Sequence, residues 1–366
     1  MNKKLISLLL SAALAVSMLT VPAFAAEGGE ADAALDETNE VVVTLGDTVT
    51  ASTVEDTDKT AADKAETADS APAASTEKKQ ITYVALGDSI VAGVGLADVK
   101  YAKDSTTLYS VDMSPNFKGY SPDCYVGKVA TMMGLDRDHA INLGLPALTA
   151  PDLADMVRDG QMPKMNMESG CWYKYPVFQD YIRKADVVSV QIGSNDAFVP
   201  CIVALGNATN WKSEALAASV LAGDLRASGS PAAALIQGIK EMHLTRDERN
   251  ATWNLLTSEM GKICDRIYPQ TTAGLISVVQ EIRKLNPDCQ ILLMGYTDPV
   301  PFVPCWHSYF KKLNKFEKQL AETYDLTYVA IPKAKTDLDV HPTISGHEYI
   351  AKKIVNSIEL AEDSVQ

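Results

Sequence analysis

Between residues 81 and 360, short runs of consecutive apolar residues alternate with longer segments in which apolar residues recur every three or four positions. Continuous apolar runs are typical of strands buried on both faces, whereas the longer spacing indicates amphipathic helices. The alternation predicts an α/β domain whose parallel sheet carries helices on both faces. We expect strands at residues 81–86, 140–143, 185–192, 291–294 and 326–331, helices at 124–133 (ending at Gly134), 151–157, 178–184, 272–285, 311–324 and 345–360, and a largely helical insertion at 200–269.

The first 25 residues have the features of a secretory signal peptide. Lys3 and Lys4 precede an apolar stretch over residues 5–20, and Ala23-Phe24-Ala25 offers the small residues of a cleavage site. This length favours a cleaved signal over a membrane span, and no second stretch of the sequence is long and apolar enough to cross a bilayer. We therefore expect a secreted or cell-surface protein with no stable membrane span after processing.

Residues 26–80 differ sharply in composition from the rest of the chain. Positions 27–80 hold fourteen Asp or Glu, four Lys, no Arg and no aromatic residue. Such a segment cannot offset its ordering entropy by burial, so we interpret it as a disordered acidic linker before a domain of residues 81–366. It accounts for most of the net charge of −14. The acidic balance argues against a nucleic acid partner.

Four polar motifs stand directly after predicted strands. Their sequences are Gly-Asp-Ser-Ile at 87–90, Asn-Leu-Gly-Leu-Pro-Ala-Leu-Thr at 142–149, Gly-Ser-Asn-Asp at 193–196 and Asp-Leu-Asp-Val-His-Pro-Thr at 337–343. Ligands of open parallel sheets bind beyond the carboxyl ends of the strands, so we expect the four motifs to meet at that edge. Each motif alone is a weak signal, but the four in this order are specific.

The motifs resemble those of the SGNH hydrolases, also called GDSL esterases and lipases, over about residues 81–360. The resemblance implies a flavodoxin-like fold, with a five-stranded parallel sheet and helices on both faces, and no metal or organic cofactor. In that family the serine of the first motif is the nucleophile, the Asn of the third donates to the oxyanion, and the His of the last is the general base. These roles fall on Ser89, Asn195 and His341.

The same residue types suit hydrolysis of a carboxylic ester through an acyl-serine intermediate. Attack by the Ser89 hydroxyl requires a base for its proton, and the imidazole of His341 is suited to that task. The developing oxyanion requires fixed donors, which the Ser89 N–H, the Asn195 side-chain amide and a backbone N–H of the second motif would supply.

Two positions depart from the family pattern. Ala147 stands where the second motif usually has Gly, and its N–H serves as an oxyanion donor only if the local dihedrals suit Ala. Gly144 is the alternative source of flexibility in this loop. The family's acid usually lies three residues before the His, where this chain has Leu338.

A neighbouring group must therefore orient the base. We predict that Asp339 orients His341, with Asp337 and the Leu338 carbonyl as the alternatives.

Other polar and aromatic residues near the motifs have simpler interpretations. We expect Asp88 and Asp196 to brace loops by hydrogen bonds, His347 to be structural, and His139, His243 and His307 to be surface or loop residues, with substrate contact as the alternative for His307. Six aromatic residues either line an acyl or aryl pocket or pack ordinarily, namely Tyr173, Tyr175, Phe198, Trp211, Phe302 and Trp306.

The leading functional hypothesis is a secreted esterase or lipase acting on a small-molecule or lipid ester. A carbohydrate O-deacetylase of the same family and an acyltransferase that uses the same intermediate are alternatives. A different class, a non-catalytic cell-surface binding module, would require an incomplete set of catalytic residues, whereas Ser, Asn and His are all present.

All six cysteines lie after residue 120, and an exported protein with an even number of cysteines favours disulfides. Cys289 precedes a strand and is predicted to be a buried thiol at the amino end of the sheet, too far from the other end for a bridge. We expect two bridges among Cys124, Cys171, Cys201, Cys264 and Cys305, with three bridges in all as the alternative.

Overall fold

The computed structural model describes residues 80–99, 117–216, 228–299, 304–336 and 341–359. The predicted signal peptide lies outside this part of the chain, and so does the predicted acidic linker up to residue 79. All of the elements below belong to the domain that the sequence predicts from residue 81 onward.

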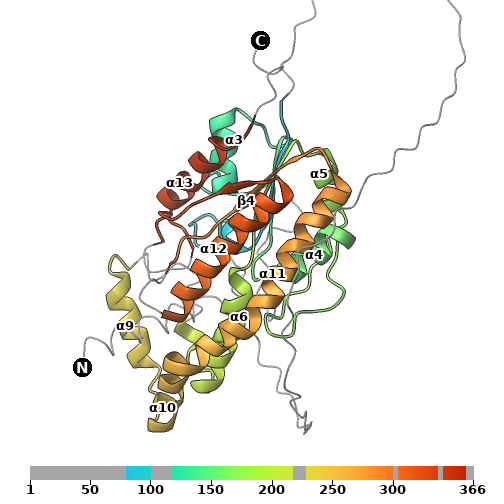
Figure 1. Ribbon diagram of the computed structural model, residues 1–366. Helices are drawn as coiled ribbons and strands as arrows, with labels where there is room; N and C mark the ends of the chain where they lie inside the picture. Colours follow the sequence, from blue (N-terminus) through green and yellow to red (C-terminus); the bar gives the residue numbers. More distant parts are fainter. Residues whose placement is uncertain (1–79, 100–116, 217–227, 300–303, 337–340, 360–366) are drawn as a thin grey trace, which may run out of the picture. The chain divides into compact units, whose positions relative to one another are not determined.

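Five parallel strands form one sheet in the order β2-β1-β3-β4-β5 (Figure 1). The first three strands are buried at every position, as their continuous apolar runs predict. The order and direction of the strands confirm the predicted flavodoxin-like α/β fold. The strands are β1 (Tyr83–Gly87), β2 (Ala140–Gly144), β3 (Val187–Gln191), β4 (Gln290–Met294) and β5 (Thr327–Val329).

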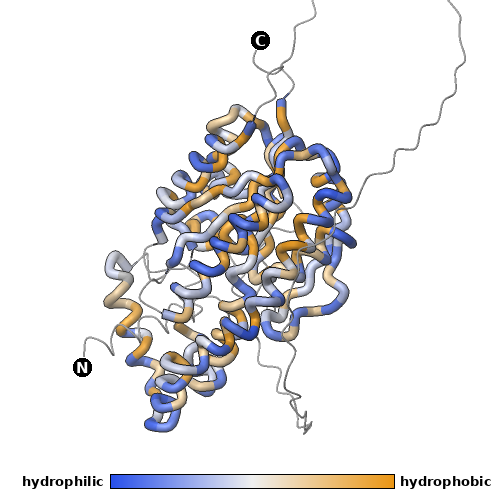
Figure 2. Tube along the Cα trace, in the orientation of Figure 1, coloured by the Kyte–Doolittle hydropathy of each residue, from blue (hydrophilic) through white to orange (hydrophobic). Residues whose placement is uncertain are grey.

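Helices cover both faces of the sheet. On one face α3 (Tyr125–Met133) packs against α13 (Ile344–Val355), and on the other α4 (Ala150–Asp159) packs against α11 (Met260–Leu285). Apolar residues run through the strands and alternate with polar residues along the helices (Figure 2). The other described helices are α2 (Ser89–Ala92), α5 (Val177–Lys184), α6 (Ser194–Ala208), α9 (Pro231–Glu241), α10 (Arg246–Asn254), the π-helical turn η2 (Leu255–Glu259) and α12 (Pro304–Tyr324).

The helix ends agree with the sequence in some places and not in others. Gly134 ends α3 as predicted, with a left-handed φ of 67°. A capping box begins α4, in which Thr149 and Asp152 bond to each other's backbone N–H groups. The predicted start of the next long helix at residue 272 is wrong, because α11 begins at Met260 and continues through Pro269. Packing of α11 against α4, α6 and α12 compensates for the hydrogen bond that proline cannot make.

The strand order reverses between β1 and β3, and the carboxyl ends of these strands carry the first and third motifs. Gly87 ends β1 against the backbone of β3. A Cβ atom at Gly87 would lie 2.0 Å from the Gln191 carbonyl oxygen, so only glycine permits this close approach. The fold therefore places the Gly-Asp-Ser and Gly-Ser-Asn-Asp segments side by side, at the point where α/β proteins bind ligands.

Candidate active site

Ser89 is the first residue of α2, which follows β1 directly. The side chain of Asp88 caps this helix, and its Oδ1 accepts a hydrogen bond from the Ile90 N–H at 2.9 Å. The helix ends after one turn at Gly93, whose φ of 82° turns the chain away. Ser89 is therefore fixed at the carboxyl end of β1, with 7% of its surface exposed.

His341 lies far from Ser89 in the chain, just before α13, and the fold brings the two residues together. Its Nε2 lies 3.0 Å from Ser89 Oγ, and the residue is buried. Thr343 caps α13 by accepting a hydrogen bond from the Gly346 N–H at 3.1 Å, which fixes the start of the helix behind His341. The structure thus brings the predicted nucleophile and the predicted base within hydrogen-bonding distance.

The predicted partners of His341 fall in a short segment before it. Asp339, Asp337 and Leu338 lie outside the described residues. Which of them orients His341 stays a prediction.

Ala147 adopts a left-handed backbone conformation with φ 60°. For a residue with a Cβ this conformation costs about 1–2 kcal/mol, which explains why glycine suits the position. Its N–H has no acceptor within the described part of the chain. Gly144, by contrast, is required by space, since a Cβ there would lie 2.3 Å from the Ala92 backbone nitrogen. The flexibility suggested for Gly144 stays a prediction.

Asn195 lies in the first turn of α6 and is buried. Its Nδ2 donates to the Leu148 carbonyl at 3.0 Å, one residue beyond Ala147. An amide nitrogen carries two hydrogens, so this bond leaves the second one for another acceptor. The Asn195 side chain therefore ties α6 to the loop that contains Ala147.

Asp88 joins three strand ends beneath the nucleophile. Its Oδ2 accepts hydrogen bonds from Ser194 Oγ at 2.7 Å and from the Tyr296 hydroxyl at 3.0 Å. Burial raises the pKa of Asp88, and these hydrogen bonds together with that from the Ile90 N–H oppose the rise. The expected bracing role is confirmed. The sequence analysis included Ser194 in the third motif without assigning it a role, and it missed Tyr296, which follows the end of β4.

Asp196 is a second buried carboxyl, and it faces α4 instead of Ser89. Its Oδ2 accepts a hydrogen bond from the Ala150 N–H at 2.9 Å, which confirms the bracing role expected for this residue. Burial raises the pKa of Asp196 to about 7, and the Ala150 N–H and the Thr271 hydroxyl oppose the rise. Asp196 therefore connects the helix that carries Asn195 to the helix that follows the Ala147 loop.

A cavity of about 360 Å³ lies beside Asp196. Its walls come from the start of α4, the segment 163–168, α6 and α11, and they include Asp152, Met165, Asp196, Val199 and Ile267. The walls mix carboxylates with apolar side chains and contain no aromatic residue. The aromatic lining that the sequence suggested is absent from this cavity.

Four of the five described aromatic residues in that prediction instead pack against one another, and Trp211 packs over Gly206 of α6. Phe198 meets Trp306 edge-on with ring centroids 4.9 Å apart, and Tyr173 stacks on Tyr175 at 6.2 Å. The Tyr173 hydroxyl also donates to the Pro146 carbonyl at 2.9 Å, next to Ala147. These contacts favour the packing interpretation for the four residues. Phe302 lies outside the described residues.

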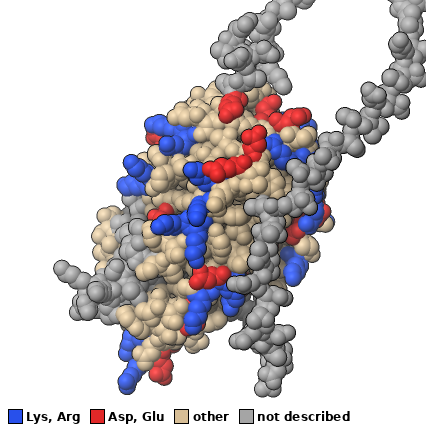
Figure 3. Space-filling view, in the orientation of Figure 1, with Lys and Arg blue, Asp and Glu red and all other residues tan. Residues whose placement is uncertain are grey.

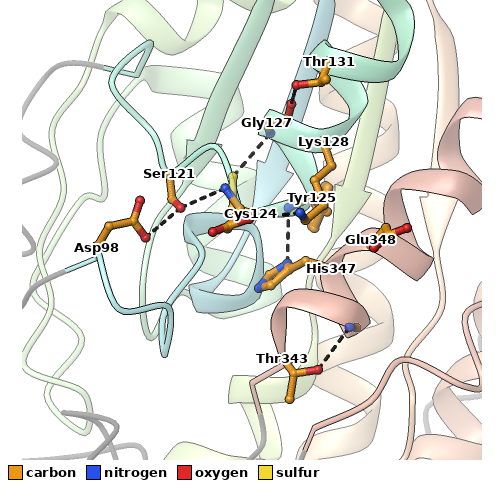
Figure 4. Close-up of polar contacts among 12 residues, drawn as sticks. Asp98, Ser121, Cys124, Tyr125, Gly127, Lys128, Thr131, Thr343, His347 and Glu348 are labelled. Carbon is orange, nitrogen blue, oxygen red and sulfur yellow. Dashed lines mark hydrogen bonds and ion pairs between the residues drawn. The ribbon is translucent and has the colours of Figure 1, made fainter.

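The remaining histidines near the motifs are held by other partners. The ring Nδ1 of His347, in α13, accepts a hydrogen bond from the Tyr125 N–H at 3.3 Å and so links α13 to α3 (Figure 4). This confirms the expected structural role of His347. His307 pairs with Asp298 at 2.8 Å on the surface.

The fold and the order of the four motifs define an SGNH-type hydrolase. The chain belongs to the GDSL-like lipase/acylhydrolase family, whose model matches residues 85–349 and so spans Ser89, Asn195 and His341. The protein is therefore a carboxylic ester hydrolase. Among the described residues, no group of three or more His, Cys, Asp or Glu is arranged to hold a metal ion. The described helices include none with the length and apolar character of a membrane span.

Solved structures of lipases and esterases are similar at low identity. An extracellular lipase from Streptomyces rimosus is 14% identical, with a TM-score of 0.43, over 76% of this chain and 100% of that chain. A lipase from a goat rumen metagenome is 15% identical, with a TM-score of 0.41, over 76% and 97%. A catalytic mutant of an acetylxylan esterase from Geobacillus stearothermophilus is 18% identical, with a TM-score of 0.37, over 77% and 98%. No curated protein matches the chain. The family assignment rests on the family model.

Proposed function

We propose that the protein is a secreted serine esterase or lipase in which Ser89 is the nucleophile and His341 the general base. The observation that carries the proposal is the 3.0 Å separation of Ser89 Oγ and His341 Nε2 at the carboxyl edge of the sheet. Both residues are buried, which shields the pair from competing water until a substrate enters.

In the first half-reaction, Ser89 Oγ attacks the ester carbonyl carbon while His341 Nε2 accepts the hydroxyl proton. The tetrahedral intermediate collapses, the carbon–oxygen bond of the ester breaks, and the protonated His341 gives its proton to the departing alcohol. In the second half, His341 takes a proton from water, the resulting hydroxide attacks the acyl-serine, and the acid is released as Ser89 regains its proton.

The oxyanion is stabilised in this proposal by three donors from three motifs: the Ser89 N–H, the Ala147 N–H and the Asn195 side-chain amide. Two features support the set. The Ala147 N–H has no acceptor within the described residues. The Asn195 amide uses one hydrogen on the Leu148 carbonyl and keeps the other.

Asp339 is the residue that we propose to orient His341, with Asp337 or the Leu338 carbonyl as alternatives. A carboxylate at this place holds the imidazole in the required tautomer and stabilises the imidazolium that forms during attack.

The proposed substrate is a small-molecule or lipid ester, met outside the cytoplasm after removal of residues 1–25. The signal-like sequence supports export. Lys and Arg are interspersed with Asp and Glu on the face shown in Figure 3, a pattern that gives a polyanion such as nucleic acid no basic stripe on that face.

The test is hydrolysis of p-nitrophenyl acetate, a p-nitrophenyl ester of a long fatty acid, and acetylated xylan by wild type and Ser89→Ala. We expect wild type to cleave at least one of the three, and Ser89→Ala to lose at least about 1,000-fold in kcat/KM while circular dichroism stays unchanged. Ser345→Ala, which removes an exposed serine of α13, is the matched control. Acetate release from xylan alone would assign carbohydrate deacetylation, and no cleavage of any ester would favour the binding module.

A further inference from the structure

The six cysteines fall into two groups in the structure, and all six carry free thiols. The contacts of three of them are to other residue types: Cys124 caps α3 through the Gly127 N–H, Cys171 lies 2.9 Å from Ser169 Oγ, and Cys289 donates to the Asn286 carbonyl at 3.4 Å. Cys289 is buried at the amino end of β4, as predicted. Neither of the two predicted bridges is formed.

The other three cysteines meet where α6, α11 and α12 pack together. Cys201 lies in α6, Cys264 in α11, and Cys305 is the second residue of α12. The side chain of Cys264 interacts with the side chains of both other cysteines. The helices agree with this, because α11 packs against both α6 and α12 (Figure 1).

The surface of α11 leaves room for Cys305 beside Cys264. Gly261 lies one turn before Cys264, and a Cβ atom placed on it would be 4.0 Å from the Cβ of Cys305. The start of α12 therefore packs on α11 at Gly261, where the absence of a side chain leaves room for it. Cys305 therefore lies against the turn of α11 that ends at Cys264, and a disulfide between the two helices needs such neighbouring positions.

The three thiols differ in access and in reactivity. Cys201 and Cys264 are buried, whereas Cys305 is partly exposed and is the one that a small molecule reaches first. The interaction with Cys264 and burial raise the pKa of Cys305, and the interaction with Cys201 and burial raise the pKa of Cys264, which the interaction with Cys305 partly opposes. Thiolates are therefore scarce at neutral pH, and exchange at this site is slow without alkaline conditions or a catalyst.

We propose that Cys264 and Cys305 are a thiol–disulfide site, which closes to a bridge in an oxidising compartment while Cys201 remains a thiol. The Cys305 thiolate attacks one sulfur of a small-molecule disulfide, which forms a mixed disulfide and releases one small thiol. The Cys264 thiolate then attacks the Cys305 sulfur, which forms the protein bridge and releases the second small thiol. The two cysteines together lose two electrons and two protons, and the small-molecule disulfide gains them.

The bridge would fasten the start of α12 to α11. Trp306 follows Cys305 directly and packs on Phe198 of α6. The first turn of α12 therefore packs against the helix that contains Asn195. Because a cross-link restricts the unfolded chain, the oxidised protein is expected to melt at a higher temperature than the reduced one.

The experiment incubates the full chain with oxidised glutathione in mildly alkaline buffer, denatures it, alkylates it without reduction, and digests it with trypsin. We expect four alkylated cysteines instead of six, and a cross-link between the peptides 263–266 and 285–311. The second peptide contains both Cys289 and Cys305, so Cys289→Ser is the matched control and keeps the cross-link.

Variants separate the possible pairings. Cys201→Ser keeps the cross-link, whereas Cys264→Ser and Cys305→Ser abolish it, and each variant is first shown to be folded by circular dichroism. Oxidation raises Tm of the wild type by at least about 5 °C, a rise that dithiothreitol reverses and that Cys305→Ser lacks. Six alkylated cysteines after oxidation, a cross-link between Cys201 and Cys264, or survival of the bridge in Cys305→Ser would overturn the proposal.

Discussion

The nucleophile turn, residues 88–93, and the oxyanion loop, residues 145–149, carry groups toward the same edge of the sheet but are held in different ways. The turn has restraints of its own, since Asp88 caps α2 and Gly93 ends it in a left-handed conformation, and Ser194 and Tyr296 add hydrogen bonds to Asp88. The oxyanion loop has Ala147 at φ 60° and is held from outside, with Tyr173 bonded to Pro146 and Asn195 bonded to Leu148.

The difference shows which residues determine the conformation of the turn and which determine that of the loop. The local conformation at Ser89 follows mainly from residues adjacent to it in the chain, and the hydrogen bonds to Asp88 fix this turn to two other strand ends. The conformation of Ala147 is unfavourable by itself and persists because tertiary hydrogen bonds hold the loop on both sides. We therefore expect changes at Ser89, or at the group that orients His341, to affect chemistry alone, and changes at the oxyanion loop to affect chemistry and stability together.

The largest expected effect on the nucleophile side, short of removing Ser89 itself, comes from the group that orients His341. Asp339→Asn is expected to lower kcat by as much as about 10⁴-fold, because the imidazole would lose its tautomer-fixing partner. Asp337→Asn is the control and should lower kcat far less. Steady-state kinetics on a p-nitrophenyl ester measures both. A larger loss in Asp337→Asn would reassign the role, and near-full activity of both variants would favour the Leu338 carbonyl.

On the oxyanion side, Asn195→Ala is expected to lower kcat by about 10²–10³-fold with little change in KM, because one donor to the transition state is lost. The variant should also lose stability, since the Leu148 carbonyl becomes a buried acceptor without a partner, at a cost of about 1–3 kcal/mol. Asn207→Ala, an exposed position in the same helix, is the control. A change in KM without a change in kcat would contradict the assignment.

The buried carboxyl of Asp196, which bonds to the start of α4, makes the stability of the fold depend on pH. Asp196 has a folded pKa of about 7 against an ordinary value of 3.8, so the folded state binds more protons between these values. Stability should therefore fall as pH rises from about 4 to 7, by on the order of 2–4 kcal/mol. Urea unfolding across this range is expected to show a shallower fall in Asp196→Asn than in wild type. Identical slopes in the two proteins would show that Asp196 does not titrate in this way.

The smallest expected effect is that of Ala147→Gly. Glycine removes the strain at φ 60° but adds entropy to the unfolded chain, so we expect a net change within about 1 kcal/mol and kcat within about threefold of wild type. Ala154→Gly, in the middle of α4, is the contrasting control and should destabilise by about 1 kcal/mol. A loss in Ala147→Gly as large as that in Ala154→Gly would contradict the left-handed conformation.

The sequence predicted the architecture and the edge at which the chemistry lies. Strands of a parallel sheet are buried on both faces and therefore mostly apolar, and polar residues directly after them must lie at its carboxyl edge, which is where Ser89 and Asn195 are found. Helix boundaries were less predictable. The Pro269 position suggested a break, but packing on three neighbouring helices outweighs one lost hydrogen bond.

Other features depend on tertiary contacts that no local pattern reveals. Ser194 and Tyr296 matter because the buried Asp88 needs donors, and that need appears only when three strand ends are brought together. The φ of Ala147 is set by bonds from Tyr173 and Asn195, so composition alone does not indicate it. The aromatic residues suggested a substrate pocket, yet Phe198 and Trp306 pack on each other between α6 and α12.

Covalent labelling tests the central claim, that Ser89 is a nucleophile activated by His341, most directly. A fluorophosphonate probe followed by intact mass and tryptic mapping should show one adduct per chain, on Ser89 within the peptide 80–100. Labelling should be absent in Ser89→Ala and slowed by at least about 1,000-fold in His341→Ala, because the hydroxyl proton then has no acceptor. An adduct on another residue, or labelling of His341→Ala at the wild-type rate, would contradict the account.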